Sequence, residues 1–158
     1  APSIVIKACE LTSATTRDFA EFDAHVARRA ALTAYDRAGL GPSDIDVAEV
    51  HDAAAFGEIL MTELLGFCPM GEGGPLAESG ETRIGGRIPV NPSGGLESKG
   101  HPIGATGLGQ IYELTQQLRG AAGARQVSGA RTALQENSGG LLGIEEGAAV
   151  VTILQRQY

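Results

Sequence analysis

The chain has 158 residues, the size of one domain, and with 42% hydrophobic and 20% charged residues its composition is typical of a globular protein in water. A net charge of -7 disfavours nucleic acids and anionic membrane surfaces as partners. A membrane span, a signal peptide and a disulfide framework are not expected, because the sequence has no long apolar run, no leader pattern and only two cysteines, and a cytoplasmic location is expected instead.

The first part of the chain alternates predicted strands and helices. Residues 3–8 are rich in β-branched side chains and predict a strand, and the helical spacing of apolar residues predicts a helix over 19–38 that Gly39 ends. Residues 45–50 predict a second strand, and residues 53–65 predict a second helix. Short connections between such elements favour a parallel sheet covered by helices.

Glycine dominates the second part of the chain. Residues 68–88 predict a long surface excursion, after which residues 88–91 form a short strand and residues 105–119 a helix. Two strands follow, over 131–135 and 148–154, joined by a glycine-rich connection. The last strand is almost continuously apolar, which predicts a central position in the sheet.

Residues 91–107, Asn-Pro-Ser-Gly-Gly-Leu-Glu-Ser-Lys-Gly-His-Pro-Ile-Gly-Ala-Thr-Gly, carry the clearest chemical signal. His101 stands between a glycine and a proline, just before a predicted helix. The dipole and backbone N–H groups of a helix N-terminus disfavour imidazolium there. A neutral imidazole can accept a proton from a nucleophile or bind a developing oxyanion. In the alternative interpretation, His101 caps a turn and the glycines serve packing alone.

A second candidate, His51, follows the second predicted strand together with Asp52. Strand ends of open parallel sheets are where such folds place reactive groups. Asp52 either orients an imidazole or caps the helix that follows it. Glu58, further along that helix, is expected to orient a neighbouring side chain. His25 is expected to be a surface or packing histidine.

These segments resemble thiolases, and specifically the sterol-carrier-protein-X branch of that family. Residues 91–107 are similar to the branch's Gly-His-Pro loop, and residues 44–52, 65–69 and 118–127 are similar to three further segments in the same order. The resemblance implies an α/β fold, the thiolase-like C-terminal half: a βαβαβαββ unit with a mixed five-stranded sheet covered by helices. Residues 1–158 would form this one domain, and the N-terminal thiolase half would lie outside the chain.

The resemblance also implies roles for individual residues. His101 would activate the nucleophile and bind an oxyanion, and His51 would assist the same oxyanion hole. Backbone N–H groups near Gly139 and Gly140 would form a second oxyanion hole. The residues expected to bind substrate are glycines and one asparagine of the motifs, namely Asn91, Gly94, Gly95, Gly100, Gly139 and Gly140.

One element of the family pattern is missing. Thiolases take a nucleophilic cysteine from the N-terminal half and a second, proton-shuttling cysteine from the C-terminal half. Ala53 and the predicted turn over residues 135–138 stand where that second cysteine is expected. Glu136, in this turn, is either a replacement acid and base with a raised pKa or a solvated loop glutamate. Cys9 and Cys68 are expected to be small packing residues.

Three functions follow from these features. The first is a thiolase-like acyltransferase that makes or cleaves a carbon–carbon bond of an acyl-CoA thioester in lipid or steroid metabolism, by β-ketoacyl-CoA thiolysis or Claisen condensation. The second is a CoA-dependent retro-aldolase of the steroid side-chain type, which works with an OB-fold partner protein. The third is a non-catalytic scaffold or lipid-binding subunit. Coenzyme A is expected as a substrate rather than a bound cofactor, no metal is expected, and complete units are expected to form homo-oligomers.

Overall fold

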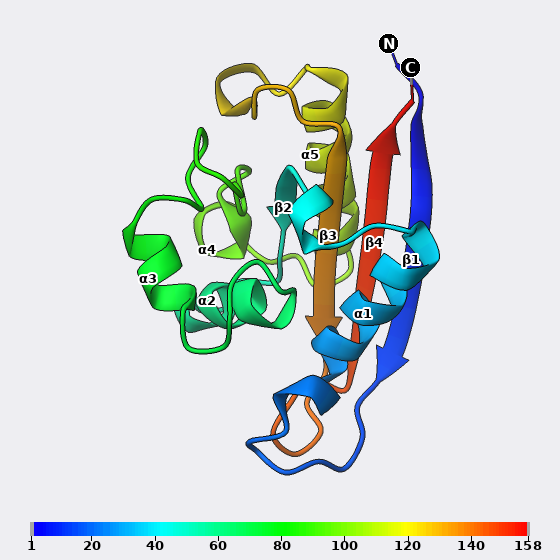
Figure 1. Ribbon diagram of the computed structural model, residues 1–158, viewed down its shortest axis with the longest axis vertical. Coiled ribbons are helices and arrows are strands. Elements are labelled where there is room, and N and C mark those ends of the chain that lie inside the picture. The colour runs from blue at the N-terminus through cyan, green and yellow to red at the C-terminus, as the bar shows by residue number, and fades with distance from the viewer. Residues whose placement is uncertain (1, 158) are drawn as a thin grey trace.

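The computed structural model describes residues 2–157, and a mixed four-stranded sheet with the order β1-β4-β3-β2 forms its centre (Figure 1). The strands are β1 (Ile4–Ser13), β2 (Val47–Glu49), β3 (Thr132–Gly139) and β4 (Ala148–Arg156). β4 pairs antiparallel with both β1 and β3, which confirms the interior position predicted from its apolar sequence. The predicted parallel sheet is wrong for most of this sheet, since only β2 and β3 run parallel.

The predicted fifth strand is reduced to one isolated bridge. Val90 lies beside Ala48 of β2 in parallel orientation, so the segment occupies the expected edge of the sheet. Pro89 has no N–H to donate, and Asn91 has a φ of 50°, a left-handed conformation that turns the chain away from β2. These two neighbours limit the pairing, and the sheet therefore has four strands instead of five.

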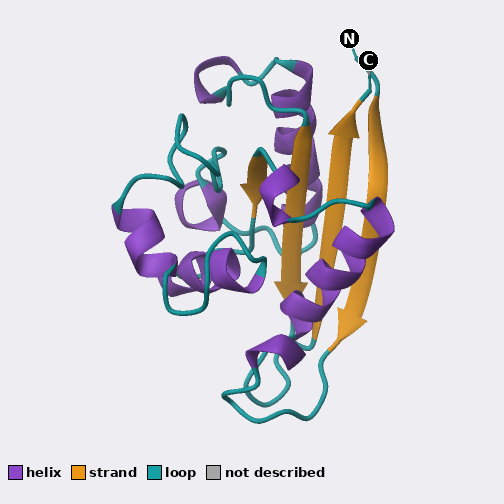
Figure 2. Cartoon of the chain, viewed as in Figure 1, coloured by secondary structure: helices purple, strands orange, loops and turns teal. Residues whose placement is uncertain are grey.

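Helices cover both faces of the sheet (Figure 2). α1 (Val26–Ala38) packs on one face against β1 and β4, in a core that also includes Leu134 of β3. α5 (Thr106–Arg119) packs on the opposite face, where Leu114 and Leu118 share a core with Ala133 of β3. Adjacent residues of β3 thus serve two separate cores, because successive side chains of a strand point to opposite faces. This is the thiolase-like mixed α/β architecture that the resemblance implied.

The first predicted helix starts later than its apolar spacing indicates. Residues Phe22–Ala24 form a short 3-10 helix, and α1 begins at Val26 because the His25 imidazole accepts the backbone N–H of Ala27 at 3.2 Å. The predicted end is confirmed, since Gly39 ends α1 with a φ of 67°.

The remaining helices lie beside β2. α2 (Ala55–Leu64) corresponds to the second predicted helix, and α3 (Gly73–Glu78) lies within the predicted surface excursion. α4 (Gly95–Lys99) is a short helix inside the glycine-rich motif that the sequence pattern did not predict. Two more 3-10 helices span Pro42–Asp44 and Gly123–Arg125. None of the helices in residues 2–157 combines the length and apolarity needed to cross a membrane.

The predicted turn over residues 135–138 is wrong, because these residues extend β3. Glu136 pairs with Val151 of β4, and Gln135 pairs with Thr152 of β4 and with Glu49 of β2. Polar side chains suggested a loop, but several of their hydrogen-bonding groups find partners inside the fold. Gln110 of α5, for example, accepts from the Gln135 amide at 3.0 Å and donates to the Glu136 carbonyl oxygen at 3.0 Å.

Candidate active site

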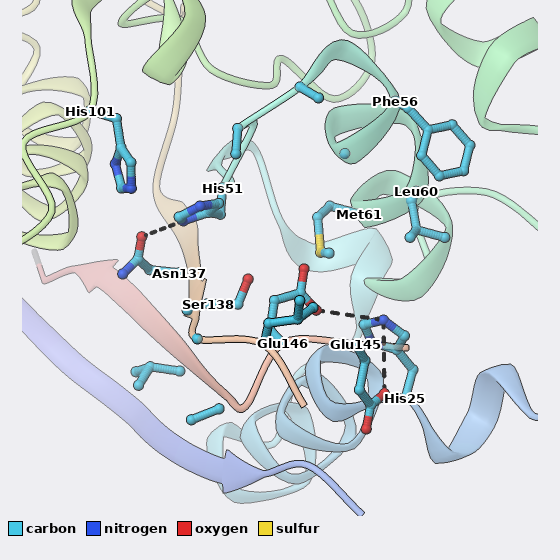
Figure 3. Close-up of a pocket in the computed structure, with 18 of the residues that line it drawn as sticks. His25, His51, Phe56, Leu60, Met61, His101, Asn137, Ser138, Glu145 and Glu146 are labelled. Atoms are coloured by element: carbon cyan, nitrogen blue, oxygen red, sulfur yellow. Dashed lines mark hydrogen bonds and ion pairs between the residues drawn. The ribbon is translucent and has the colours of Figure 1, made fainter. Parts of the chain in front are cut away.

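A cavity of about 840 Å³ opens at the carboxyl ends of β2 and β3. Segments far apart in the sequence form its walls: the loop after β2 with His51, the beginning of α2, the loop before α5 with His101, and the connection from β3 to β4. Figure 3 shows these side chains converging. The fold thus brings the two candidate histidines, fifty residues apart in sequence, to one site.

β3 holds His51 at two points. Its ring Nδ1 lies 3.1 Å from Oδ1 of Asn137, and its backbone N–H donates to Oε2 of Glu136 at 3.0 Å. An amide oxygen only accepts hydrogen bonds, so the neutral ring carries its proton on Nδ1 and a lone pair on Nε2.

His101 is fixed by the first residue of α5. Its Nδ1 lies 2.8 Å from the hydroxyl oxygen of Thr106, and that hydroxyl donates to the carbonyl oxygen of Pro102 at 3.3 Å. With the Thr106 hydroxyl donating to Pro102, the matching assignment has Thr106 accept from His101, so that Nδ1 of His101 carries the ring proton. The Nε2 lone pair of His101 is therefore also free.

The rings of His51 and His101 meet edge to face, with centroids 4.9 Å apart and an angle of 83° between their planes. Each ring has its Nδ1–H engaged by a protein acceptor, which leaves both Nε2 atoms as proton acceptors. A ring that takes up a proton at Nε2 becomes a hydrogen-bond donor to an oxyanion that forms in the same step. The pair can therefore move a proton and stabilise the negative charge that results.

Glu136 lies beneath this pair and is fully buried, so the alternative of a solvated loop glutamate is wrong. Burial raises its pKa to about 7; the hydrogen bond from His51 N–H opposes the rise, and the charge of Glu146 adds to it. One of its carboxyl oxygens, Oε1, makes no hydrogen bond of normal geometry within residues 2–157, but the Ser138 hydroxyl lies near enough to the carboxyl group to lower its pKa. Glu136 is not part of the cavity wall, and its contact with the site is the backbone of His51.

Asn91 is buried behind the cavity, where it joins three segments. Its Oδ1 accepts the backbone N–H of Val50 at 2.8 Å, and its Nδ2 donates to Oε2 of Glu58 at 2.8 Å. Burial raises the pKa of Glu58, and the hydrogen bond from Asn91 lowers it. Asn91 therefore anchors the start of the Gly-His-Pro loop to β2 and α2, and Glu58 orients Asn91.

A buried carboxylate holds the same loop a few residues later. Glu49 of β2 accepts the backbone N–H of Ser93 at 3.0 Å and the Ser93 hydroxyl at 2.6 Å, and Nζ of Lys99 lies 3.3 Å away. Burial raises the pKa of Glu49, while Ser93 and Lys99 lower it. Sequence reasoning missed Glu49, since a glutamate inside a short strand gives no sign of a partner more than forty residues away.

Asp52 caps a helix, but not the one that follows it. Its Oδ1 accepts the backbone N–H of Leu96 in the first turn of α4 at 2.7 Å. The N-terminus of α2 has Ala54 as its cap residue and receives no side-chain hydrogen bond there. Gly95 permits this approach, because a Cβ at this position would lie 2.0 Å from Oδ2 of Asp52.

The predicted substrate-binding glycines fall into two groups. Gly139 and Gly140 line the cavity, where the chain leaves β3. Gly94, Gly95 and Gly100 are not part of its wall; with φ values of 93°, 60° and 90° they form the turns at the two ends of α4. These turns set the path of the chain into His101.

No cysteine among residues 2–157 lines the cavity. Ala53, at one of the places where the resemblance implied a cysteine, lies in its wall. Cys9 lies on β1, 3.6 Å from the Thr152 hydroxyl, and Cys68 lies near Thr62 on the far side of α2.

Four further polar residues line the cavity without having been predicted, namely His25, Ser138, Glu145 and Glu146. Of the two expectations for His25, the surface histidine is wrong and the packing histidine is confirmed, since the ring is buried; the ring also forms part of this wall. The sequence around His25 does not indicate this role. Residues 145 and 146 come near His25 only because the sheet places the β3–β4 connection beside the start of α1.

Comparison with known protein families identifies the family of this chain. The description "Thiolase C-terminal domain-like" matches residues 8–156, and the chain belongs to this family. Sterol carrier protein 2 of Rattus norvegicus is 56% identical over 133 residues, which are 84% of this chain and 23% of that protein. An acetyl-CoA acetyltransferase of Methanothermobacter thermautotrophicus is 51% identical over 140 residues, or 89% of this chain and 35% of that protein.

A solved structure titled "Ltp2-ChsH2(DUF35) aldolase" has the same fold. It superimposes with a TM-score of 0.78 at 23% identity, covering 98% of this chain and 40% of that one. The chain thus spans about a quarter to a third of the length of the curated relatives it matches, and these relatives associate it with thiolase-like, lipid-related proteins.

Proposed function

We propose that this chain is the C-terminal half of a thiolase-like acyltransferase that makes or cleaves a carbon–carbon bond next to an acyl-CoA thioester. An N-terminal thiolase half, from the same gene or a separate subunit, supplies the nucleophile. The observation that carries the proposal is the His51–His101 pair, whose rings line the cavity edge to face while Asn137 and Thr106 occupy their Nδ1 atoms. The relatives named sterol carrier protein and acetyl-CoA acetyltransferase support an acyl-CoA substrate.

The proposed chemistry uses the fixed tautomers. The incoming nucleophile gives its proton to Nε2 of His101, and the new N–H then donates to the thioester oxygen as negative charge develops on it. His51 acts on the same oxygen, directly or through water. Gly139 and Gly140 offer backbone N–H groups at the other wall for a second oxyanion. Thr106 and Asn137 keep both rings oriented throughout.

Retro-aldol cleavage of a β-hydroxyacyl-CoA is a second candidate, and the alanine at position 53 favours it. That reaction needs a base for the β-hydroxyl and an oxyanion site for the enolate, but no proton-shuttling cysteine. The cavity wall provides the imidazoles of His51 and His101 as bases, and no thiol among residues 2–157. This second candidate function includes an OB-fold partner protein. The similar structure whose title names an aldolase supports it only through the shared fold.

Reconstitution with the N-terminal half tests both candidates. A β-ketoacyl-CoA with free CoA should yield two shorter thioesters in the first case, and a β-hydroxyacyl-CoA should release an aldehyde or ketone in the second. His101→Ala should lower kcat by about 10²- to 10⁴-fold, the usual contribution of a positioned acid and base. Tyr112→Phe, exposed on α5 outside the cavity, is the matched control. Unchanged turnover in His101→Ala would favour a non-catalytic scaffold.

A further inference from the structure

One end of the cavity contains polar residues that have no role in the proposed reaction. Ser138, Glu145, Glu146 and His25 line this part, and we call them the polar end. In Figure 3, His25, Glu145 and Glu146 lie away from His51 and His101, whereas Ser138 lies next to Asn137, between the histidine pair and Glu146. Phe56, Leu60 and Met61, on the α2 side of the cavity, give its wall an apolar surface.

The polar end contains buried hydrogen-bonding atoms without partners. Glu145 is 4% exposed; its Oε2 accepts from Arg17 at 2.6 Å and from the Val26 N–H at 3.2 Å, but its Oε1 has no partner among residues 2–157. Within the same residues, Oε2 of Glu146 also has no hydrogen-bond partner. The hydroxyl of Ser138, which is 5% exposed, makes no hydrogen bond of normal geometry, but it lies near enough to the Glu136 carboxyl group to lower its pKa. Buried polar atoms are rarely left unpaired, so the two glutamate oxygens indicate groups that a ligand satisfies.

His25 does not donate a hydrogen bond to these unpartnered oxygens. Its Nδ1 accepts the Ala27 N–H, so the neutral ring carries its proton on Nε2. That atom lies 4.0 Å from Oε2 of Glu145 and 3.8 Å from Oε2 of Glu146, beyond hydrogen-bond distance. Burial lowers the pKa of His25, although the two glutamates oppose this, which favours the uncharged ring.

The charge at the polar end is negative. Arg17 balances Glu145, whereas Glu146 has only His25 as an ion-pair partner among the described residues. Glu136 lies behind, close enough for the charge of Glu146 to raise its pKa. A ligand group that enters here must therefore donate hydrogen bonds, and a carboxylate would meet repulsion.

We infer that the polar end is a second subsite, which binds a hydrogen-bond-donating group, a hydroxyl or an ammonium, carried on the acyl chain beyond the thioester. The chain would run along Phe56, Leu60 and Met61, and its donor would reach Ser138, Glu145 and Glu146. The identity of the ligand as an acyl thioester rests on the proposed function; the donor requirement rests on the unpartnered oxygens.

Equilibrium binding to the 158-residue chain itself tests this subsite. Calorimetric titration compares CoA thioesters of straight-chain acids that end in a methyl, hydroxyl, ammonium or carboxylate group, over a graded series of chain lengths. At the length that spans the cavity, the hydroxyl or ammonium compound should bind about tenfold more tightly than the methyl compound, the effect of one hydrogen bond to a charged acceptor. The carboxylate compound should bind more weakly than all of them. Equal affinities at every length, or no binding of any compound, would overturn the inference.

Two variants show which side chain of the polar end recognises which donor group of the ligand. Glu146→Gln keeps an accepting oxygen but removes the charge, so it should abolish a preference for ammonium and retain a preference for hydroxyl. Ser138→Ala should reduce the hydroxyl preference by several-fold. Glu78→Gln, exposed on α3 and outside the cavity, is the control and should change neither. A preference that survives in Ser138→Ala and in Glu146→Gln alike would contradict the assignment to these side chains.

The two proposals fail in different ways. If the reconstituted enzyme turns over simple acyl-CoA substrates while terminal donors bring no gain in affinity, the second subsite is wrong and the proposed function stands. If terminal donors raise affinity as expected but the reconstituted enzyme, with either class of substrate, shows no turnover, the proposed function is wrong and the subsite stands.

Discussion

Asp52, in the loop after β2, accepts at its Oδ1 a hydrogen bond from the backbone N–H of Leu96, 2.7 Å away in α4. This bond joins the segment that carries His51 to the segment that carries His101. Both partners are buried, so neither group has water as a substitute if the other is removed. The geometry of the histidine pair therefore depends on a residue that itself is not part of the cavity wall.

Replacement of Asp52 should destabilise the domain. We expect Asp52→Ala to lower the free energy of unfolding by about 1–3 kcal/mol, the cost of a buried N–H without a partner. Urea unfolding followed by circular dichroism measures this. Asp36→Ala, exposed on α1, should change stability by no more than about 0.5 kcal/mol. Equal effects of the two substitutions would show that the Asp52–Leu96 bond adds nothing.

Gly95 and Gly109 should respond oppositely to alanine. In Gly95→Ala the new Cβ would meet Oδ2 of Asp52 at 2.0 Å, and the φ of 60° adds backbone strain, so we expect a loss of about 2 kcal/mol or more. Gly109 lies within α5, where a Cβ would meet no atom within 4 Å, so Gly109→Ala should stabilise the protein by about 0.5–1 kcal/mol. Thermal unfolding of both variants gives the comparison, and loss of stability in both would contradict it.

Glu136 should make the stability of the protein depend on pH. Its pKa is about 7 in the folded protein, against an ordinary value of 4.5, so the folded state binds more protons than the unfolded state between these values. The contribution of Glu136 to stability is thus greatest below pH 4.5 and is lost as the pH rises towards 7. Glu136→Gln keeps an acceptor for the His51 N–H and does not titrate.

The comparison of wild type with Glu136→Gln checks this sign. Relative to wild type, the variant should gain stability progressively between pH 4.5 and 7, by up to about 3 kcal/mol, and the gain should level off above that range. Urea unfolding at a series of pH values measures the difference. A difference that stays constant across the range would mean that the carboxyl group titrates normally.

Thr106 should determine the tautomer of His101. Thr106→Val preserves the shape of the side chain but removes the acceptor of the Nδ1 proton, so the ring should become a mixture of tautomers. Nitrogen chemical shifts of the imidazole, measured by NMR, distinguish the two forms. His51, whose Nδ1 faces Asn137, should keep its tautomer and is an internal control. A His101 spectrum that the substitution leaves unchanged would rule out Thr106 as the orienting group.

Local sequence patterns predicted the elements whose cause is local. The apolar run of β4 predicted its interior position, Gly39 predicted the end of α1, and the helix expected over residues 105–119 corresponds to α5. The string around His101 was specific enough for the family, which the match over residues 8–156 shows. These features depend on periodicity and on backbone conformations that few residue types adopt, and both are visible along the chain.

Tertiary structure alone decided what the polar residues do. Glu136 looked like part of a turn, yet pairing with β4 places it in a strand and burial raises its pKa. Asp52 caps α4 instead of its own helix, and His25 lies beside Glu145 and Glu146, more than a hundred residues later in the sequence. A polar side chain has no fixed spacing to its partner, because hydrogen bonds across a fold depend on the order of strands. The sequence alone therefore determined the family, most of the helix and strand pattern and the two candidate histidines. The tertiary structure decided which residues orient these histidines and which polar residues line the other end of the cavity.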